Sequence, residues 1–156
     1  MRQLATYSGS DLNLSISGPM TGGPILASGI SARGIRSVTV RMTVDQSNLQ
    51  VGMDGGVAPS VMPGDMGEVE IDMFQTSTLH NDMLLWWNNL KVAQLAGDVS
   101  EWFSATLLIS NIYDGSSHTC TGVAPAKIPD KPYREQAQGV VWILRACQIV
   151  HEIGTV

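Results

Sequence analysis

Apolar and polar residues alternate strictly in three stretches of this chain: residues 11–17, 35–45 and 67–76. Successive side chains of a β-strand point to opposite faces, so this pattern predicts strands with one buried and one solvated face. The third stretch is the clearest, because its two faces differ most: Val69, Ile71 and Met73 on one face, and Glu68, Glu70 and Asp72 on the other. We therefore predict a half-buried sheet and expect residues 35–74 to form a β-meander.

The remaining pattern predicts one helix and several further strands. Between residues 79 and 94, apolar residues recur every three or four positions, which is the spacing of one helix face. Ser77 or Thr78 is suited to cap this helix. The other predicted elements are strands at 101–111, 117–126 and 139–151 and a hairpin at 51–61 that turns at Asp54-Gly55-Gly56. We find no repeat or linker, and we expect a single domain over residues 1–156, mainly β with one flanking α-helix.

The acidic face of residues 67–76 is unusual but energetically tolerable in water. Neighbouring carboxylates on one face of a strand lie about 6.6 Å apart. Their repulsion at that distance is only about 0.6 kcal/mol per pair in bulk water. An ordinary solvated sheet face is therefore one reading of Glu68, Glu70 and Asp72, and a functional surface is the other.

Composition excludes several classes of function. Charged residues make up 15% of the chain and the formal net charge is −5, so the basic stripe of a general nucleic-acid binder is missing. The same deficit of positive charge argues against adhesion to anionic membranes. No run of about eighteen apolar residues and no apolar signal-like stretch at the start is present. We therefore expect a soluble protein made in the cytosol, with no membrane partner.

Candidate chemistry is sparse, and we expect no enzyme, no metal and no cofactor. The three histidines, His80, His118 and His151, lack the spacing of metal ligands. A triad of His118, Cys120 and Asp114 can be drawn, but it lies in or beside a short turn with no evident rigid support. Glu68 with Glu70 as a sugar-cleaving acid–base pair offers no reason for their pKa values to separate.

Two further possibilities concern binding and disulfide chemistry. Trp102 and Trp142 could stack on a sugar in a β-sandwich ligand-binding module, although both lie in strands that the pattern predicts to be buried. Cys147 lies in an apolar run and reads as a small buried side chain. A disulfide between Cys120 and Cys147 stays open, because no spacing motif demands or forbids it.

The order of features resembles a known family. Gly67-Glu68-Val69-Glu70-Ile71-Asp72-Met73-Phe74-Gln75-Thr76-Ser77 runs directly into a helix that contains Asn81-Asp82, and Ala126-Lys127-Ile128-Pro129-Asp130 is followed by Val141-Trp142-Ile143-Leu144-Arg145-Ala146-Cys147. Together these segments resemble the tail tube proteins of contractile-tailed bacteriophages. The likeness extends from about residue 11 to 154, and its most telling parts are the Gln-Thr-Ser end of the acidic strand and the closing Trp-x-Leu-Arg strand.

The resemblance implies a β-sandwich or barrel-like fold that forms hexameric rings. Stacked rings would make a hollow conduit for genomic DNA during ejection, inside a contractile sheath in the virion tail, assembled in the host cytoplasm. The implied partners are further copies of the chain and the sheath, tape-measure, baseplate and terminator proteins. A tube subunit of an R-type bacteriocin or of a type VI secretion-like machine is the alternative within the same fold.

The resemblance also suggests roles for two groups of residues. We expect the bore to be lined by a polar set that DNA passes without binding: Glu68, Glu70, Asp72, Thr39, Arg41 and Thr43, with Asp45 nearby. Such family members often carry neutral hydroxyl residues where the three acids stand, so the charge of the bore is particular to this chain. We expect Arg41 to pair with Glu70 or Asp72.

The second group is the hairpin, which we expect to contact an adjacent ring or subunit. Its apolar residues exceed what a free loop tip needs: Leu49, Val51, Met53, Val57 and Val61. The alternative is that these five side chains complete the core of their own subunit.

Overall fold

Within the residues that the computed structural model describes (12–28, 34–112, 115–136 and 138–154), seven strands form one sheet. The order across the sheet is β2-β1-β7-β8-β9-β6-β3, and each neighbouring pair is antiparallel. The strands are β1 (Leu12–Ser17), β2 (Ile25–Ser28), β3 (Ile35–Met42), β6 (Gly67–Phe74), β7 (Ala105–Asn111), β8 (Ser117–Pro125) and β9 (Gly139–Glu152). The chain is thus mainly β, as predicted.

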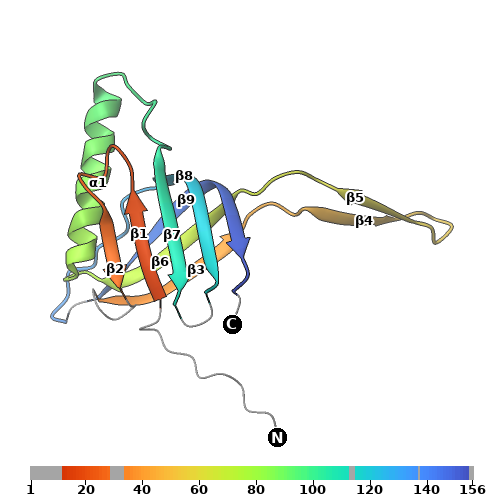
Figure 1. The fold of residues 1–156 in the computed structure, drawn as a ribbon, viewed down its shortest axis with the longest axis horizontal. Helices are drawn as coiled ribbons and strands as arrows, with labels where there is room; N and C mark the ends of the chain where they lie inside the picture. Colours follow the sequence, from red (N-terminus) through yellow and green to blue (C-terminus); the bar gives the residue numbers. More distant parts are fainter. Residues whose placement is uncertain (1–11, 29–33, 113–114, 137, 155–156) are drawn as a thin grey trace, which may run out of the picture.

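The sheet curls into a half-barrel, which brings its two ends toward each other (Figure 1). Leu12 and Leu14 of β1 line one pocket together with Val38 of β3, although four strands separate β1 from β3 in the sheet. The concave side therefore holds the core. The predicted barrel-like shape is confirmed in this form.

Alternation along β6 is confirmed by burial. Val69, Ile71 and Met73 are completely buried, while the acidic residues between them are partly exposed. In the neighbouring β9, Trp142 is opposite Ile71 and is equally buried. The centre of the core is therefore built from two strands whose apolar residues face the same side.

The described residues contain a single helix, α1 (Thr78–Leu95), which covers one side of the half-barrel (Figure 1). Ser77 caps it as predicted, because its Oγ accepts a hydrogen bond from the backbone N–H of Leu79 at 3.1 Å. The apolar face of the helix, including Trp86 and Leu90, is buried against the sheet. Asn89 fixes the helix to the loop before β2 by donating to the carbonyl oxygen of Met20 at 2.9 Å.

Strands β4 (Ser47–Val51) and β5 (Val57–Val61) form a separate two-stranded ladder. This hairpin projects away from the half-barrel as a long arm (Figure 1). The predicted hairpin is confirmed, and its turn contains Gly55 at φ +83°. The predicted meander over residues 35–74 is wrong, because β3 pairs directly with β6 and the arm leaves the sheet between them.

Two strands are shorter than predicted, and one further strand was not predicted. β3 ends at Met42 rather than at residue 45, since the chain there turns into the arm. β7 begins at Ala105 rather than at residue 101, because the preceding residues form turns in which the Ser104 hydroxyl donates to the Glu101 carbonyl oxygen. The short strand β2 was not predicted, because only four residues pair and a Gly- and Pro-rich loop precedes them.

Gly67 marks the place where β9 extends beyond β6. The two strands pair from Gly67 with Ala146 to Phe74 with Gly139, and beyond Ala146 β9 is paired with β8 only. A Cβ atom on Gly67 would collide with the Cδ1 atom of Ile149 and lie 2.5 Å from the Arg41 carbonyl oxygen. The absent side chain lets Ile149 close the end of the core.

Candidate assembly surfaces

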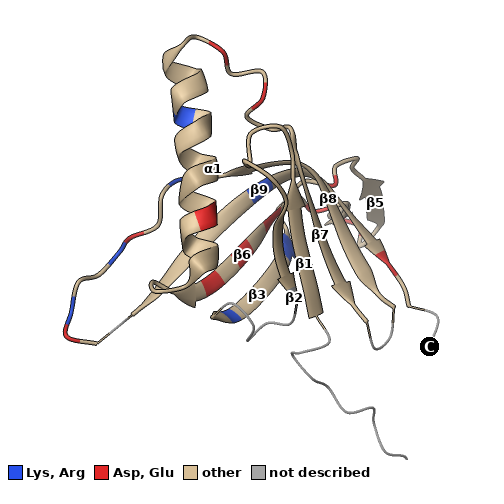
Figure 2. Ribbon diagram, turned by 60° about the vertical axis from the view of Figure 1, so that its left-hand side comes forward, with Lys and Arg blue, Asp and Glu red and all other residues tan. Residues whose placement is uncertain are grey.

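Charged residues of both signs gather on the neighbouring strands β3, β6 and β9 (Figure 2). On β6 they alternate with the buried Val69, Ile71 and Met73 and so lie on the face opposite to the core. We call these residues the charge ladder: Arg36 and Arg41 of β3, Glu68, Glu70 and Asp72 of β6, and Arg145 of β9. They lie on one face because the pairing register places Arg41 and Arg145 on either side of Glu68. The expected lumen residue Thr39 lies opposite Glu70 on the same face.

Ion pairs connect the members of the charge ladder across the strands. Arg41 contacts Glu70 through its Nη2 atom and lies 3.8 Å from Glu68 through its Nε atom. The Nε atom of Arg145 lies 3.6 Å from Glu68 Oε1. Arg36 Nη1 lies 3.9 Å from Asp72 Oδ2. The expected pairing of Arg41 with Glu70 is confirmed, whereas Asp72 is held by Arg36.

The acidic row is therefore neutralised locally, which corrects the expectation of a wholly acidic face. Three arginines face three carboxylates, so the formal charge of the ladder is zero. Arg36 and Arg145 lie 32 and 77 positions from Glu68 in sequence, so only the pairing of the strands brings them together. Because all six side chains are partly exposed, each pair contributes little to stability. The consequence of the ladder is a surface without free positive charge.

The other two expected lumen residues lie at the edge of this face. Thr43 follows the end of β3, and its hydroxyl donates to the Met66 carbonyl oxygen at 3.3 Å. Asp45 lies two residues further, already within the arm. The polar face thus continues from the sheet toward the base of the hairpin.

The arm has one apolar and one polar face. The register pairs Val51 with Val57 and Leu49 with Pro59, so their side chains and that of Val61 share one face. Asn48, Gln50, Ala58 and Ser60 occupy the other face. The expected contact residues Leu49, Val51, Met53, Val57 and Val61 are between 56% and 109% exposed. The alternative that they complete the core of their own subunit is therefore wrong.

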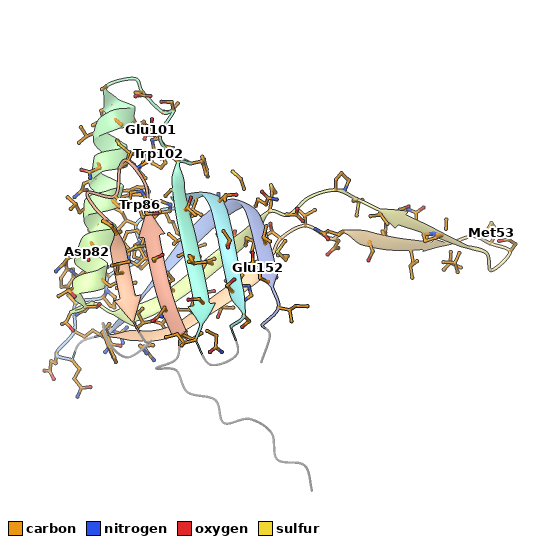
Figure 3. The ribbon with its side chains drawn as sticks, viewed as in Figure 1. Met53, Asp82, Trp86, Glu101, Trp102 and Glu152 are labelled. Atoms are coloured by element: carbon orange, nitrogen blue, oxygen red, sulfur yellow. The ribbon has the colours of Figure 1, made fainter. Side chains whose placement is uncertain are left out.

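Met53 lies at the far tip of the arm, away from the sheet and the helix (Figure 3). The turn is held by Gly52 and Gly56, whose backbone groups bond at 2.8 Å. The Asp54 carboxylate accepts from the Gly56 N–H at 2.9 Å. An isolated two-stranded hairpin is at best marginally stable in water. An exposed apolar face on such an arm is typical of a surface that contacts another chain.

Both ends of the seven-stranded sheet are open among the described residues. Among the described strands, β2 and β3 each have one neighbour in the sheet, so they are its edge strands. Such edges accept a strand from another chain. The half-barrel therefore offers two further surfaces for assembly.

The catalytic and sugar-binding candidates are not supported by the structure. Burial raises the pKa of the Cys120 thiol to about 11, so it stays protonated at neutral pH. Cys120 and Cys147 are both free cysteines, and the predicted burial of Cys147 is wrong, because this side chain is exposed. Asp114 lies outside the described residues. Trp142 is fully buried and cannot stack on a sugar. Trp102 lies in the turn before β7 and packs edge-on against Trp87 of α1, with ring centroids 5.7 Å apart.

Solved structures share this fold at low sequence identity. A chain in the six-fold-symmetrised structure of the anti-feeding prophage baseplate is 12% identical, with a TM-score of 0.58 and complete coverage of both chains. A chain in the sheath–tube complex of PVC, an extracellular contractile injection system, is 10% identical with a TM-score of 0.57, covering 92% of this chain and 89% of that one. The fold is thus one that contractile injection systems use.

The sequence identifies the family more closely. Residues 4–154 match the profile of the family described as Bacteriophage PhiTE tail tube protein, and the chain belongs to this family. The resemblance to phage tail tube proteins is thereby confirmed. A comparison with curated protein sequences gives no match. In the described part of the chain, no helix has the length and apolar character needed to cross a membrane.

Proposed function

We propose that six copies of this chain close into a ring and that the rings stack into a hollow tail tube, through which DNA leaves the virion. The position of β2 and β3 at the edges of the sheet supports this proposal, because an edge strand can pair with a strand of another copy. A head-to-tail contact of this kind closes into a ring when the rotation between copies is suitable. The six-fold baseplate with the same fold supports the number of subunits.

The observation that carries the stacking proposal is the exposed apolar face of the arm. Leu49, Val51 and Val57 lie exposed on one side of a hairpin that projects away from the half-barrel (Figure 1). We assign this face to an adjacent subunit or ring, which would bury it. Met53 at the tip and Val61 near the base extend the same contact along the length of the arm.

The charge ladder, with Thr39 and Thr43 at its side, faces the bore in this proposal. A wall that binds phosphates would hold the DNA in place, since affinity for DNA grows with each available Lys or Arg. In the ladder each arginine already has a carboxylate partner. The wall would therefore attract the duplex weakly, and the DNA would slide along it.

The proposed partners follow from the tube. The sheath surrounds it, the tape-measure protein occupies it during assembly, and the baseplate and terminator proteins close its ends. Assembly takes place in the host cytoplasm, and the role is structural rather than catalytic. A tube of a contractile injection system outside a phage, such as an R-type bacteriocin or a type VI-like machine, is the second candidate, favoured by the fold shared with PVC.

Electron microscopy of the purified full-length chain tests this proposal. We expect hollow tubes, or single six-fold rings at low concentration. A matched variant lacking residues 47–61, joined through a short Gly-Ser turn, should keep the fold and lose the tubes. A wild-type chain that stays monomeric at high concentration would contradict the proposal, as would unchanged tubes from the variant without the arm.

A further inference from the structure

Two histidines lie side by side where β8 begins and β9 ends. His118 and His151 are directly opposite each other in the pairing register. Their Nδ1 atoms are 2.7 Å apart, and the rings are perpendicular with centroids 4.7 Å apart. The next inward-facing pair along the strands is Cys120 and Ile149, both buried. The histidine pair therefore belongs to the concave side of the sheet, at the open end of the half-barrel.

The contacts of His151 determine which nitrogen carries a proton. Its Nε2 atom lies 3.4 Å from the sulfur atom of Met42. A thioether can only accept a hydrogen bond, so Nε2 of His151 is the donor. In the neutral ring, Nδ1 of His151 then presents a lone pair. His118 consequently donates from its own Nδ1 across the 2.7 Å contact.

We propose that His118 and His151 form a bidentate site for a divalent transition-metal ion such as Zn²⁺, Ni²⁺ or Cu²⁺. The ion would take the place of the proton between the two Nδ1 atoms, and His118 would move its proton to Nε2, so no net proton is released. Bonds of about 2.0–2.1 Å with an angle of 90–109° at the metal place the two nitrogens about 2.9–3.3 Å apart. The rings need to separate by only a few tenths of an ångström.

The surroundings allow an ion to enter and to keep its own water ligands. His118 lines a pocket of about 310 Å³ beside Val40 and Ile109. His151 lines another of about 430 Å³, together with Met42 and Asp65. In the described residues no group of three or more His, Cys, Asp or Glu side chains could hold a metal ion, so water would complete the shell.

One contact prepares the pair for metal binding. The contact with Met42 orients His151 in the manner of an outer partner that fixes the tautomer of a ligand. All ligands come from one subunit, so the site does not depend on tube formation.

Few other histidine or cysteine side chains of this protein can interfere with a metal-binding measurement. The sequence has three histidines and two cysteines. His80 and Cys120 are buried, so Cys147 is the other histidine or cysteine side chain that is exposed among the described residues. A Cys147→Ser variant of the full-length protein therefore serves as the reference. Titration calorimetry and thermal unfolding are then measured with ZnCl₂, NiCl₂ and, as a control, MgCl₂.

We expect one zinc or nickel ion per chain, a melting temperature raised by several degrees at millimolar metal, and no response to Mg²⁺. His118→Gln and His151→Gln should each weaken binding at least tenfold. Met42→Leu should weaken it about tenfold, as loss of an orienting partner does. Binding that persists in the double histidine variant, or no saturable binding at millimolar zinc, would overturn the proposal.

A spectroscopic readout covers the case in which a histidine variant fails to fold. In the ¹⁵N spectrum of the reference protein, zinc should shift the Nδ1 resonances of two histidine rings together and leave the third ring unchanged. A shift of a single ring, or of none, would overturn the proposal without the use of any histidine variant.

Discussion

The indole Nε1 of Trp142 donates a hydrogen bond to Nδ1 of His80 across 3.0 Å, which joins β9 to α1 inside the core. Because Nδ1 of His80 accepts, its proton resides on Nε2. That atom is buried and has no hydrogen-bond partner among the described residues. Burial lowers the pKa of His80, and the positive charge of Lys131 lowers it further. The core therefore requires a neutral His80.

This arrangement predicts a loss of stability in acid. The pKa of His80 is near 6.5 in the unfolded chain and lower in the folded one, so the unfolded state takes up the proton first. Stability is then full above about pH 6.5 and falls as the pH drops below it, by at most about 1.4 kcal/mol per pH unit for one such group. Urea unfolding between pH 7.5 and pH 5 measures the slope.

Two variants show whether His80 causes this pH dependence of stability. The pKa of His118 is also lowered and acts in the same direction, so the comparison is made in a His118→Gln background. Adding His80→Gln should flatten the pH dependence, whatever its effect on stability at pH 7.5. An unchanged slope would show that other groups cause the acid sensitivity.

Gly67→Ala should destabilise the subunit by about 1–3 kcal/mol, the usual cost of overpacking. The new methyl group would lie 2.5 Å from the Arg41 carbonyl oxygen and collide with Ile149. Thermal or chemical unfolding measures the change. Gly55→Ala, at the tip of the arm where nothing lies within 4 Å of an added Cβ atom, is the control without a steric clash. This variant measures only the cost of alanine at a positive φ. An equal loss of stability at Gly67 and Gly55 would contradict the steric explanation.

Val51→Asp should stop tube formation while leaving the subunit folded. Val51 is 71% exposed and lies on the apolar face of the arm, so its replacement should change the free energy of unfolding by no more than about 0.5 kcal/mol. A buried unpaired carboxylate in the assembled contact would be costly. Sedimentation of assembled tubes is expected to show at least a tenfold higher concentration threshold.

Gln50→Asp provides the matched control, because it places the same charge on the polar face of the same strand. We expect tubes from this variant at close to the wild-type threshold. If the two aspartate variants assemble equally well, or fail equally, the apolar face of the arm is not the contact surface.

Replacing Glu68 and Glu70 with Gln and Asp72 with Asn should slow the passage of DNA. The three arginines of the charge ladder would lose their partners, and the local formal charge would change from zero to +3. Free arginines attract phosphates, and this attraction falls with salt. We expect slower ejection from virions that carry the variant, with recovery as ionic strength rises.

The reverse change tests the sign of the effect. Replacing Arg36, Arg41 and Arg145 with Gln leaves a charge of −3 on the same face, and ejection should then be at least as fast as in the wild type. Unchanged ejection and infectivity after neutralisation of the three acids would refute the electrostatic role of the ladder, even if the tube itself forms.

The sequence correctly predicted those elements that show a regular spacing of apolar residues or a clear helix cap. The strict alternation of Val69, Ile71 and Met73 defined β6, and the apolar spacing after Ser77 defined α1. The short strand β2 was missed because four residues are too few to show a period. Trp102 was wrongly placed in a strand, since a β-favouring side chain gives the same local signal when it anchors a turn to a helix.

The surfaces were harder to predict, because they depend on pairing between distant strands. The acids of β6 are visible in ten consecutive residues, but Arg36 and Arg145 reach them only through the order β9-β6-β3. The histidine pair was equally hard to predict from the sequence. His118 and His151 are 33 positions apart, and only the register of β8 and β9 places them opposite each other. Sequence spacing alone carries no sign of either contact.

Helical reconstruction of the assembled tube by cryo-electron microscopy shows where each surface of the subunit lies. We expect six copies per ring, Glu70 on the wall of the bore, and Val51 and Val57 buried against a neighbouring copy. A tube in which Glu70 lies on the outer surface, or in which the arm stays free in solvent, would refute the proposed assembly.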